Sequence, residues 1–281
     1  MLSRQTRLWP TLGTVHPPMH WQTSCRFNKT RASSLTLADL SEDIVRLAFE
    51  LAADDIHVGL FSTHVKSLLC DARIMTPSHI PDILKKCSSA RSLALWIAVA
   101  EVPQPLLTIL GSNLLAPTHL SAGEHLFGLG IKATFSYPIF RNVTHLNALW
   151  HEEVSPWDWS TLPELLAVTH LHVDVYFHTA HPAQTTRTIL SLCAPTLRVF
   201  IFGFILPMNG STGLAKELRA IDKGELDPRV VLAAYSSSLE YCLEEPDNAL
   251  EVSGGEIYND WGHPSTTLTT LWERAWSGQS R

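Results

Sequence analysis

The tripeptide Thr-His-Leu occurs three times in this chain, at Thr118–Leu120, Thr144–Leu146 and Thr169–Leu171. The leucines that end the three copies are 26 and 25 residues apart. An identical tripeptide at nearly constant spacing indicates an internal repeat, because each copy then occupies the same place in a repeated structural unit.

The repeat extends in both directions from these copies. Segments at residues 65–68 and 92–95 precede it in the same register, and residues 197–201 follow it. The steps between successive apolar anchors are 25, 27, 26, 25 and 28 residues. The anchors are Leu68, Leu93, Leu120, Leu146, Leu171 and Val199. This period falls in the range of about 20–29 residues that leucine-rich repeats show.

Strands and helices are expected to alternate in each unit. Apolar and polar residues alternate around each anchor, which is typical of a half-buried strand. Between anchors, Ile80, Ile83, Leu84 and Cys87 follow the i, i+3, i+4, i+7 pattern of one helix face. Cys87 and Cys193 each precede an anchor by six residues, which predicts a structural role for both. The strands are expected at residues 65–69, 92–96, 118–122, 143–148, 169–174 and 197–202.

One strand and one helix cannot bury an apolar face alone, so the units must stack. The predicted fold is an α/β, curved solenoid of irregular leucine-rich repeats, with one parallel strand and one helix per unit and right-handed connections. We expect residues 61–243 to form this solenoid. Residues 1–37 are expected to be a disordered or poorly structured leader, residues 38–60 a capping helix, and residues 244–281 a C-terminal cap or tail. Within that cap, a closing helix over 266–276 carries Leu268, Leu271, Trp272 and Ala275 on one side.

Composition narrows the classes of function. Of the 281 residues, 45% are apolar and 17% charged, which is typical of a chain with a packed core. The net charge of -6 argues against a nucleic-acid binder. No apolar run is long enough to span a membrane. The five cysteines include no C-x-x-C pair, so neither a zinc clasp nor a disulfide framework is expected.

The leader is basic and has no acidic residue before Asp39, as in a mitochondrial transit peptide. Its prolines Pro10, Pro17 and Pro18 interrupt an amphipathic helix, however. A cytoplasmic or nuclear location is therefore expected, with mitochondria as the alternative.

The stretch Leu40–Ala52 resembles the first helix of an F-box. The stretches 80–87, 140–146 and 162–165 look like the irregular repeats of the F-box/leucine-rich-repeat families of mushroom-forming fungi, and the resemblance covers roughly residues 38–275. It implies that the F-box docks on the Skp adaptor of a cullin ubiquitin ligase while the repeats hold a target. The implied adaptor contacts are Leu40, Ile44, Leu47 and Phe49.

This chain departs from the family pattern. Ser41 replaces the motif proline, and the segment before the first repeat strand is too short for a complete three-helix F-box. The box is therefore truncated or degenerate. The alternative is that its apolar stripe caps the first repeat, as the ends of solenoids require.

One cluster suggests catalysis. His170, His172 and Asp174 alternate along one strand, so their side chains share a face and resemble the H-x-H-x-D-H signature of metallo-β-lactamase-type hydrolases. Val175 replaces the final histidine of that signature. His119 and His145 occupy the same register as His170, but neither is followed by a second histidine two residues later. The favoured interpretation is therefore that these are surface histidines and that no metal is bound. A metal-dependent hydrolase is the less favoured alternative.

No other catalytic or nucleotide-binding motif is present, so neither an enzyme nor a cofactor is expected. What remains is a broad strand face with few charges, which suits a protein or peptide partner better than phosphates. The positions expected to face outward are Ser67, Ser92, Ala94, His119, Ser121, His145, His170, His172, Asp174, Arg198 and Phe200. The candidate partner contacts among them are His119, His145, His170, His172, Asp174 and Arg198.

The sequence thus predicts a non-catalytic protein-binding module, either an F-box-like substrate receptor or a stand-alone repeat scaffold without a link to a ubiquitin ligase. It does not name the partner, because a repeat scaffold fixes the shape of a surface and not its target.

Overall fold

The computed structural model describes residues 65–71, 77–97, 102–128, 131–151, 157–176, 181–205, 212–235, 243, 246–252 and 270–279. All of them belong to one compact unit, residues 49–281. The leader, the helix predicted over 38–60 and the four adaptor contacts Leu40, Ile44, Leu47 and Phe49 lie outside the described residues.

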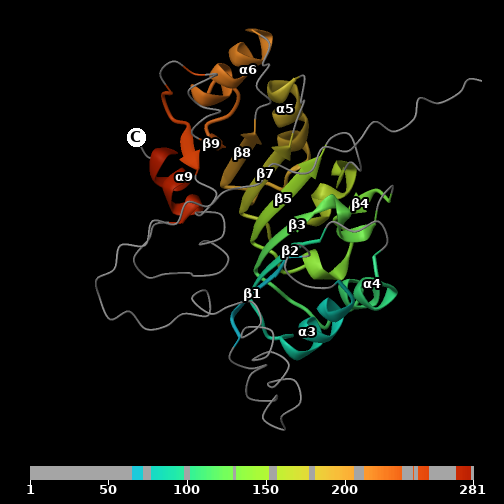
Figure 1. Ribbon diagram of the computed structural model, residues 1–281. Helices are drawn as coiled ribbons and strands as arrows, with labels where there is room; N and C mark the ends of the chain where they lie inside the picture. The colour runs from blue at the N-terminus through green and yellow to red at the C-terminus, as the bar shows by residue number, and fades with distance from the viewer. Residues whose placement is uncertain are drawn as a thin grey trace, which may run out of the picture. The chain divides into compact units, whose positions relative to one another are not determined.

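Eight strands form one parallel sheet in which neighbours follow chain order (Figure 1). The six segments predicted as strands are confirmed as consecutive parallel neighbours. Two further strands extend the same sheet. The strands are β1 (Ser67–Asp71), β2 (Ser92–Trp96), β3 (His119–Gly123), β5 (His145–His151), β7 (His170–Tyr176), β8 (Val199–Ile205), β9 (Val230–Tyr235) and β10 (Leu250–Val252).

Helices connect most of the neighbouring strands. Helix α3 (Ile80–Lys86) lies between β1 and β2, and α4 (Gln104–Leu110) between β2 and β3. Helix α5 (Pro182–Leu192) follows β7, and α6 (Thr212–Asp222) follows β8. The chain therefore has an α/β fold in which helices alternate with parallel strands.

The two central connections differ from the predicted strand-plus-helix unit. Between β3 and β5 the described residues form short 3-10 helices at Glu124–Phe127 and Pro138–Phe140, and between β5 and β7 one at Trp159–Glu164. Pro163 lies inside the last of these turns, where its missing N–H donor and its ring oppose a longer α-helix. Two short strands, β4 (Ala133–Thr134) and β6 (Trp157–Asp158), pair with each other beside these turns.

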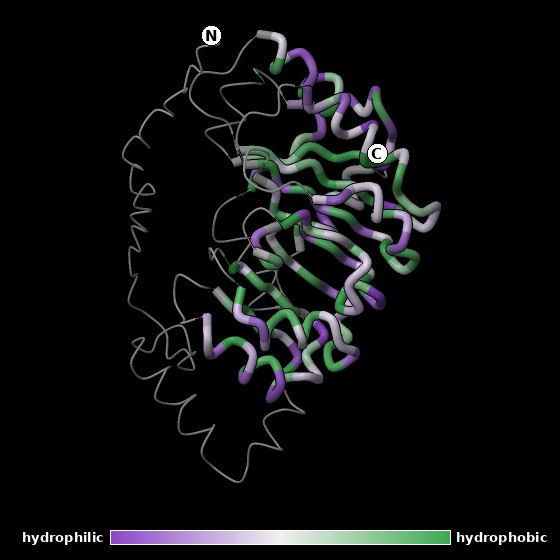
Figure 2. Tube along the Cα trace, turned by 90° about the vertical axis from the view of Figure 1, so that its right-hand side faces the viewer, coloured by the Kyte–Doolittle hydropathy of each residue, from purple (hydrophilic) through white to green (hydrophobic). Residues whose placement is uncertain are grey.

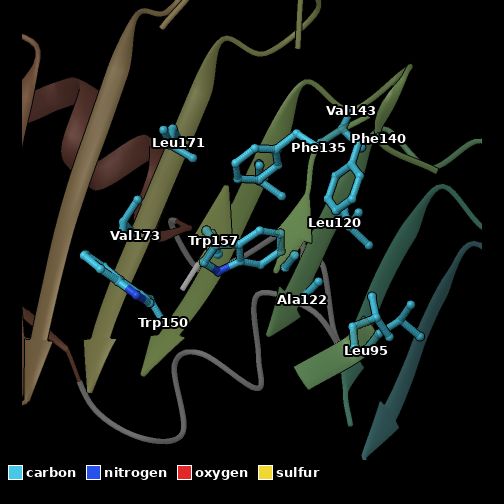
Figure 3. Close-up of a cluster of buried hydrophobic side chains, with 14 of the residues drawn as sticks. Leu95, Leu120, Ala122, Phe135, Phe140, Val143, Trp150, Trp157, Leu171 and Val173 are labelled. Atoms are coloured by element: carbon cyan, nitrogen blue, oxygen red, sulfur yellow. The ribbon is translucent and has the colours of Figure 1, made fainter. Parts of the chain in front are cut away.

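Aromatic side chains fill the space that α-helices occupy elsewhere (Figure 3). Phe135 stacks on Trp157 with ring centroids 4.7 Å apart, and Phe140 meets Trp157 edge-on. The indole of Trp157 donates a hydrogen bond to the carbonyl of Leu149 at 3.0 Å. These large rings pack against small and aliphatic residues of the central strands, among them Leu120 and Ala122, so the irregular units still close a continuous core.

The leucine anchors lie in one register across the sheet. Leu68, Leu93, Leu120, Leu146 and Leu171 are successive cross-strand partners and are buried on the face covered by the connecting helices. Figure 2 shows hydrophobic residues in each of the neighbouring strands.

The sixth anchor was predicted wrongly. Leu171 pairs with Phe200, whereas Val199 pairs with His170. Phe200, expected to face outward, is buried in the core on the helix-covered face, and Val199 is on the opposite face. The reason is that β8 is apolar on both faces, so its sequence carries no alternation from which the register can be determined.

The last helix, α9 (Leu271–Gln279), lies on the other side of the sheet from α3, α4 and α5 (Figure 1). Its Leu271, Trp272 and Ala275 are buried together, as predicted for one side of a closing helix. Leu268, the fourth residue of that predicted side, lies outside the described residues. Among the helices that the structure describes, none is long and apolar enough to cross a membrane.

Candidate functional site

The three repeated histidines stack on one another along the N-terminal ends of their strands. His119, His145 and His170 are cross-strand partners on β3, β5 and β7. Their ring centroids are 4.2 and 4.1 Å apart, and the planes are tilted by only 12° and 6°. Parallel in-register strands place identical side chains at nearly this spacing, so the repeat itself produces the stack. These three residues are named the histidine row.

The threonine of each Thr-His-Leu copy holds its histidine in place. The hydroxyl oxygens of Thr118, Thr144 and Thr169 lie 3.0, 2.9 and 2.8 Å from Nδ1 of the following histidine. Each hydroxyl also contacts a carbonyl of the preceding unit, as Thr144 does with the carbonyl of Thr118 at 3.0 Å. Threonine therefore links neighbouring units, histidine stacks and leucine enters the core, which explains why the tripeptide is repeated as a whole.

The histidine row is uncharged at neutral pH. Burial, together with repulsion from His119 and His170 in their protonated forms, lowers the pKa of His145 to about 3. Burial also lowers the pKa of His119 and of His170, the latter with a contribution from the positive charge of Arg198. The row was predicted to be exposed, but the structure shows it half-buried. Arg198 is exposed, just before β8.

A second row on the same face is almost completely buried. Ser121, Asn147 and His172 are cross-strand partners with exposed fractions of 0, 2 and 3%. These three residues are named the polar row. Ser121 and His172, together with Ala94 and Asp174, were predicted to face outward into solvent, and that prediction is wrong because all four are buried. Part of the reason is that α9 lies over this face at β7 and β8, and a helix so distant in sequence leaves no local signal.

The hydrogen bonding of the polar row is incomplete. Ser121 accepts a hydrogen bond from the indole of Trp96 at 2.9 Å. By contrast, Oδ1 of Asn147 and Nε2 of His172 are buried and have no hydrogen-bond partner among the described residues. Burial lowers the pKa of His172 to about 3, so this ring is also neutral at neutral pH. Buried polar atoms of this kind are uncommon and costly in folded proteins.

Gly203 makes room for His172 and Asp174. It is the cross-strand partner of Asp174 on β8. A Cβ atom at Gly203 would lie 2.5 Å from Nε2 of His172 and 2.7 Å from Oδ1 of Asp174, closer than real Cβ contacts. The two side chains therefore lean over the glycine. Its position inside an otherwise apolar strand was a sequence signal for such a close approach.

Helix α9 covers the end of both rows through Trp272. The indole centroid lies 5.6 Å from the ring of His145, 5.7 Å from His170 and 6.0 Å from His172, each time nearly perpendicular. The apolar partners of the helix on the sheet are Val199, Ile201, Val231, Ala233 and Val252. Sequence reasoning missed this contact and the burial of Asn147.

The residues of the suggested metal cluster take two different positions. His170 belongs to the stack, whereas His172 and Asp174 lean toward Gly203. Stacked parallel rings direct their nitrogens side by side, and a zinc site needs nitrogens that converge at about 2.0–2.1 Å from one ion. Within the described ranges, no group of three or more His, Cys, Asp or Glu residues is placed to hold a metal ion.

Comparison with known proteins gives no relative. No known protein family, no curated protein and no solved structure matches the chain.

Proposed function

We propose that this chain is a non-catalytic protein-binding module, a curved solenoid of irregular leucine-rich repeats whose partner contacts the histidine row. The observation that carries the proposal is the row itself. His119, His145 and His170 come from three neighbouring units, lie in one register and retain partial exposure. A strip of like residues across successive repeats is how repeat proteins build an extended binding surface.

The strand order supports binding over catalysis. In open α/β enzymes the ligand site lies where the order of strands reverses. In this sheet, the eight described strands follow chain order from one edge to the other without such a reversal. The described strands therefore form no switch point of the kind at which those enzymes bind their ligands.

The chemistry of the row suits a protein or peptide. Its rings are neutral at neutral pH, and Ser67 and Ser92 continue the same register on β1 and β2. The edges of the stacked rings and the serine hydroxyl groups offer contact area and hydrogen bonds without a cluster of charge. The exposed Arg198 at the end of the row would contact an acidic group of the partner.

The resemblance to F-box proteins adds an adaptor to this proposal. The segment 38–60 would dock on the Skp adaptor of a cullin ubiquitin ligase through Leu40, Ile44, Leu47 and Phe49, which lie outside the described residues. In the alternative, the chain is a stand-alone scaffold. Purified adaptor that binds the wild-type chain but not an Ile44→Asp variant supports the receptor, and no binding by either supports the scaffold.

Partner capture tests the binding face. The full chain and its His119→Glu variant are used as baits in the same cell extract, with Lys85→Glu on α3 as the matched control. His119 is chosen because it is half-buried and Trp272 makes no ring contact with it in the described structure. A specific partner should be retained by the wild type and the control and reduced about tenfold or more by His119→Glu. Equal retention by all three chains would contradict the proposal.

The remaining alternative is a metal-dependent hydrolase built on His170, His172 and Asp174. Metal analysis of the untagged chain separates it from a binding module. One equivalent of zinc that disappears in a His172→Ala variant, together with a hydrolytic activity lost in parallel, would favour the hydrolase.

A further inference from the structure

We propose that helix α9 is an internal ligand of the sheet face, and that the partner displacing it is an amphipathic helix with the same Leu-Trp-x-x-Ala pattern. This inference rests on the proposed function, because it names the kind of partner that the same face binds. The helix shows directly which chemistry that face accepts.

The contact of α9 is separate from the main core. Leu271, Trp272 and Ala275 pack with residues of β8, β9 and β10 in an apolar cluster of their own. The leucine anchors and the connecting helices form a different cluster on the opposite face. Because the two clusters do not share residues, α9 can leave the sheet without dismantling the core that holds the strands.

Helix α9 carries its own N-terminal cap. The backbone N–H of Thr270 donates to a carboxylate oxygen of Glu273 at 2.8 Å, and the N–H of Glu273 donates to the hydroxyl of Thr270 at 3.2 Å. This reciprocal arrangement is a capping box, which stabilises the first turn from within the helix. A helix this short is still marginal in water, so docking supplies most of its order.

The fit of α9 to the face is incomplete. It covers His172 with the Trp272 ring, yet Nε2 of His172 and Oδ1 of the neighbouring Asn147 have no hydrogen-bond partner among the described residues. A buried polar atom costs most when it is left without a partner. An occupant with the same apolar pattern and an added amide or hydroxyl group next to its tryptophan would satisfy these atoms. Such a helix would replace α9.

A labelled peptide of residues 268–281 tests whether the site can be vacated. It is titrated into the full wild-type chain and into a full-chain Ala275→Asp variant. Ala275 is fully buried against the sheet, so a carboxylate there releases α9 and leaves the face open. The variant should bind the peptide at least about tenfold more tightly than the wild type, in which α9 occupies the face. The matched control Ser277→Asp changes an exposed position of the same helix and should exclude the peptide as the wild type does.

Peptide variants test the chemistry of recognition. A Trp272→Ala peptide should lose binding to the Ala275→Asp chain by about tenfold or more, and a Trp276→Ala peptide should bind like the parent because that tryptophan is 49% exposed. Absence of binding to a folded Ala275→Asp chain, or equal binding to the wild type, would overturn the inference.

Hydrogen exchange on the wild-type chain tests the same inference without a variant. Amides of residues 271–279 should exchange faster than those of β7 and β8, and exchange of α9 only with the whole sheet would also overturn it. The peptide and hydrogen-exchange experiments do not test the contact of a partner with His119. The capture experiment on the histidine row therefore tests the proposed function separately.

Discussion

The two faces of the sheet differ in the residues that they carry and in the elements that cover them. The helix-covered face is a continuous apolar core in which leucines repeat in register and aromatic rings replace the missing helices. In the part of the chain that the structure describes, the opposite face carries stacked histidines, a buried polar row with incomplete hydrogen bonding, and helix α9 from the far end of the chain. The first face is organised for stability. The second combines neutral polar groups with a helical cover that we propose can be displaced by a partner.

Truncation of a core leucine should have the largest effect. Leu171 is fully buried among the anchors, so Leu171→Ala should lower the free energy of unfolding by about 2–5 kcal/mol. Denaturant unfolding monitored by circular dichroism measures this loss. A loss below about 1 kcal/mol would show that this face is not the main source of stability.

Gly203→Ala should be the most harmful small change on the opposite face. The new methyl group would meet His172 and Asp174 at distances that require one of them to move, and both are buried. Overpacking of this kind costs about 1–3 kcal/mol. In a His172→Ala background the cost of Gly203→Ala should be clearly smaller, and equal costs in the two backgrounds would refute the close approach.

Stability should fall in acid because of the buried histidines. The pKa of His172 is about 3 in the folded chain and near the ordinary value of 6.5 when unfolded, so the unfolded state binds the proton first. The stability contributed by the neutral ring is present above pH 6.5 and is lost as the pH falls from there toward 3. The loss is at most about 1.4 kcal/mol per pH unit for one such group. The half-buried His145 contributes in the same direction, with a smaller effect because solvent reaches it.

Unfolding curves between pH 7 and 4.5 measure this dependence. A His172→Gln variant should show a flatter pH profile than the wild type, because glutamine does not titrate. Parallel profiles for the two chains would mean that His172 is not the buried titrating group.

The threonine bridges should have the smallest measurable effect. Thr144→Val keeps the shape of the side chain but removes the hydroxyl between the carbonyl of Thr118 and Nδ1 of His145. The expected cost is about 0.5–1.5 kcal/mol. Thr108→Val, at an exposed helix position, is the matched control and should stay within about 0.5 kcal/mol of the wild type. If both substitutions lower the free energy of unfolding by the same amount, the hydrogen bonds of Thr144 add no stability beyond the intrinsic effect of replacing threonine by valine.

The sequence was most informative where successive units repeat the same residues at the same positions. Leu120, Leu146 and Leu171 could be placed in a core because their tripeptide recurs with the same period. The register of β8 could not be predicted, since Val199–Phe202 is apolar on both faces. The central connections form 3-10 helices, and a prediction from periodicity alone took no account of Pro163 inside one of them.

The burial of the polar row could not be predicted from the neighbouring sequence, for a different reason. Asn147 and His172 have the alternation of exposed strand residues, and a cover that includes Trp272 comes from the far end of the chain. Gly203 in an apolar strand was a local sign that another group approaches this face closely.

The claim that the histidine row contacts a protein partner can be tested most directly by site-specific photocrosslinking. A photoreactive amino acid is placed at position 119 in one chain and at position 85 on α3 in another, and both are irradiated in the same cell extract. The proposal predicts a covalent adduct with one protein from position 119 and none with that protein from position 85. Adducts with the partner from position 85 alone would show that it binds the helix-covered side, and the histidine row would then be only a structural stack.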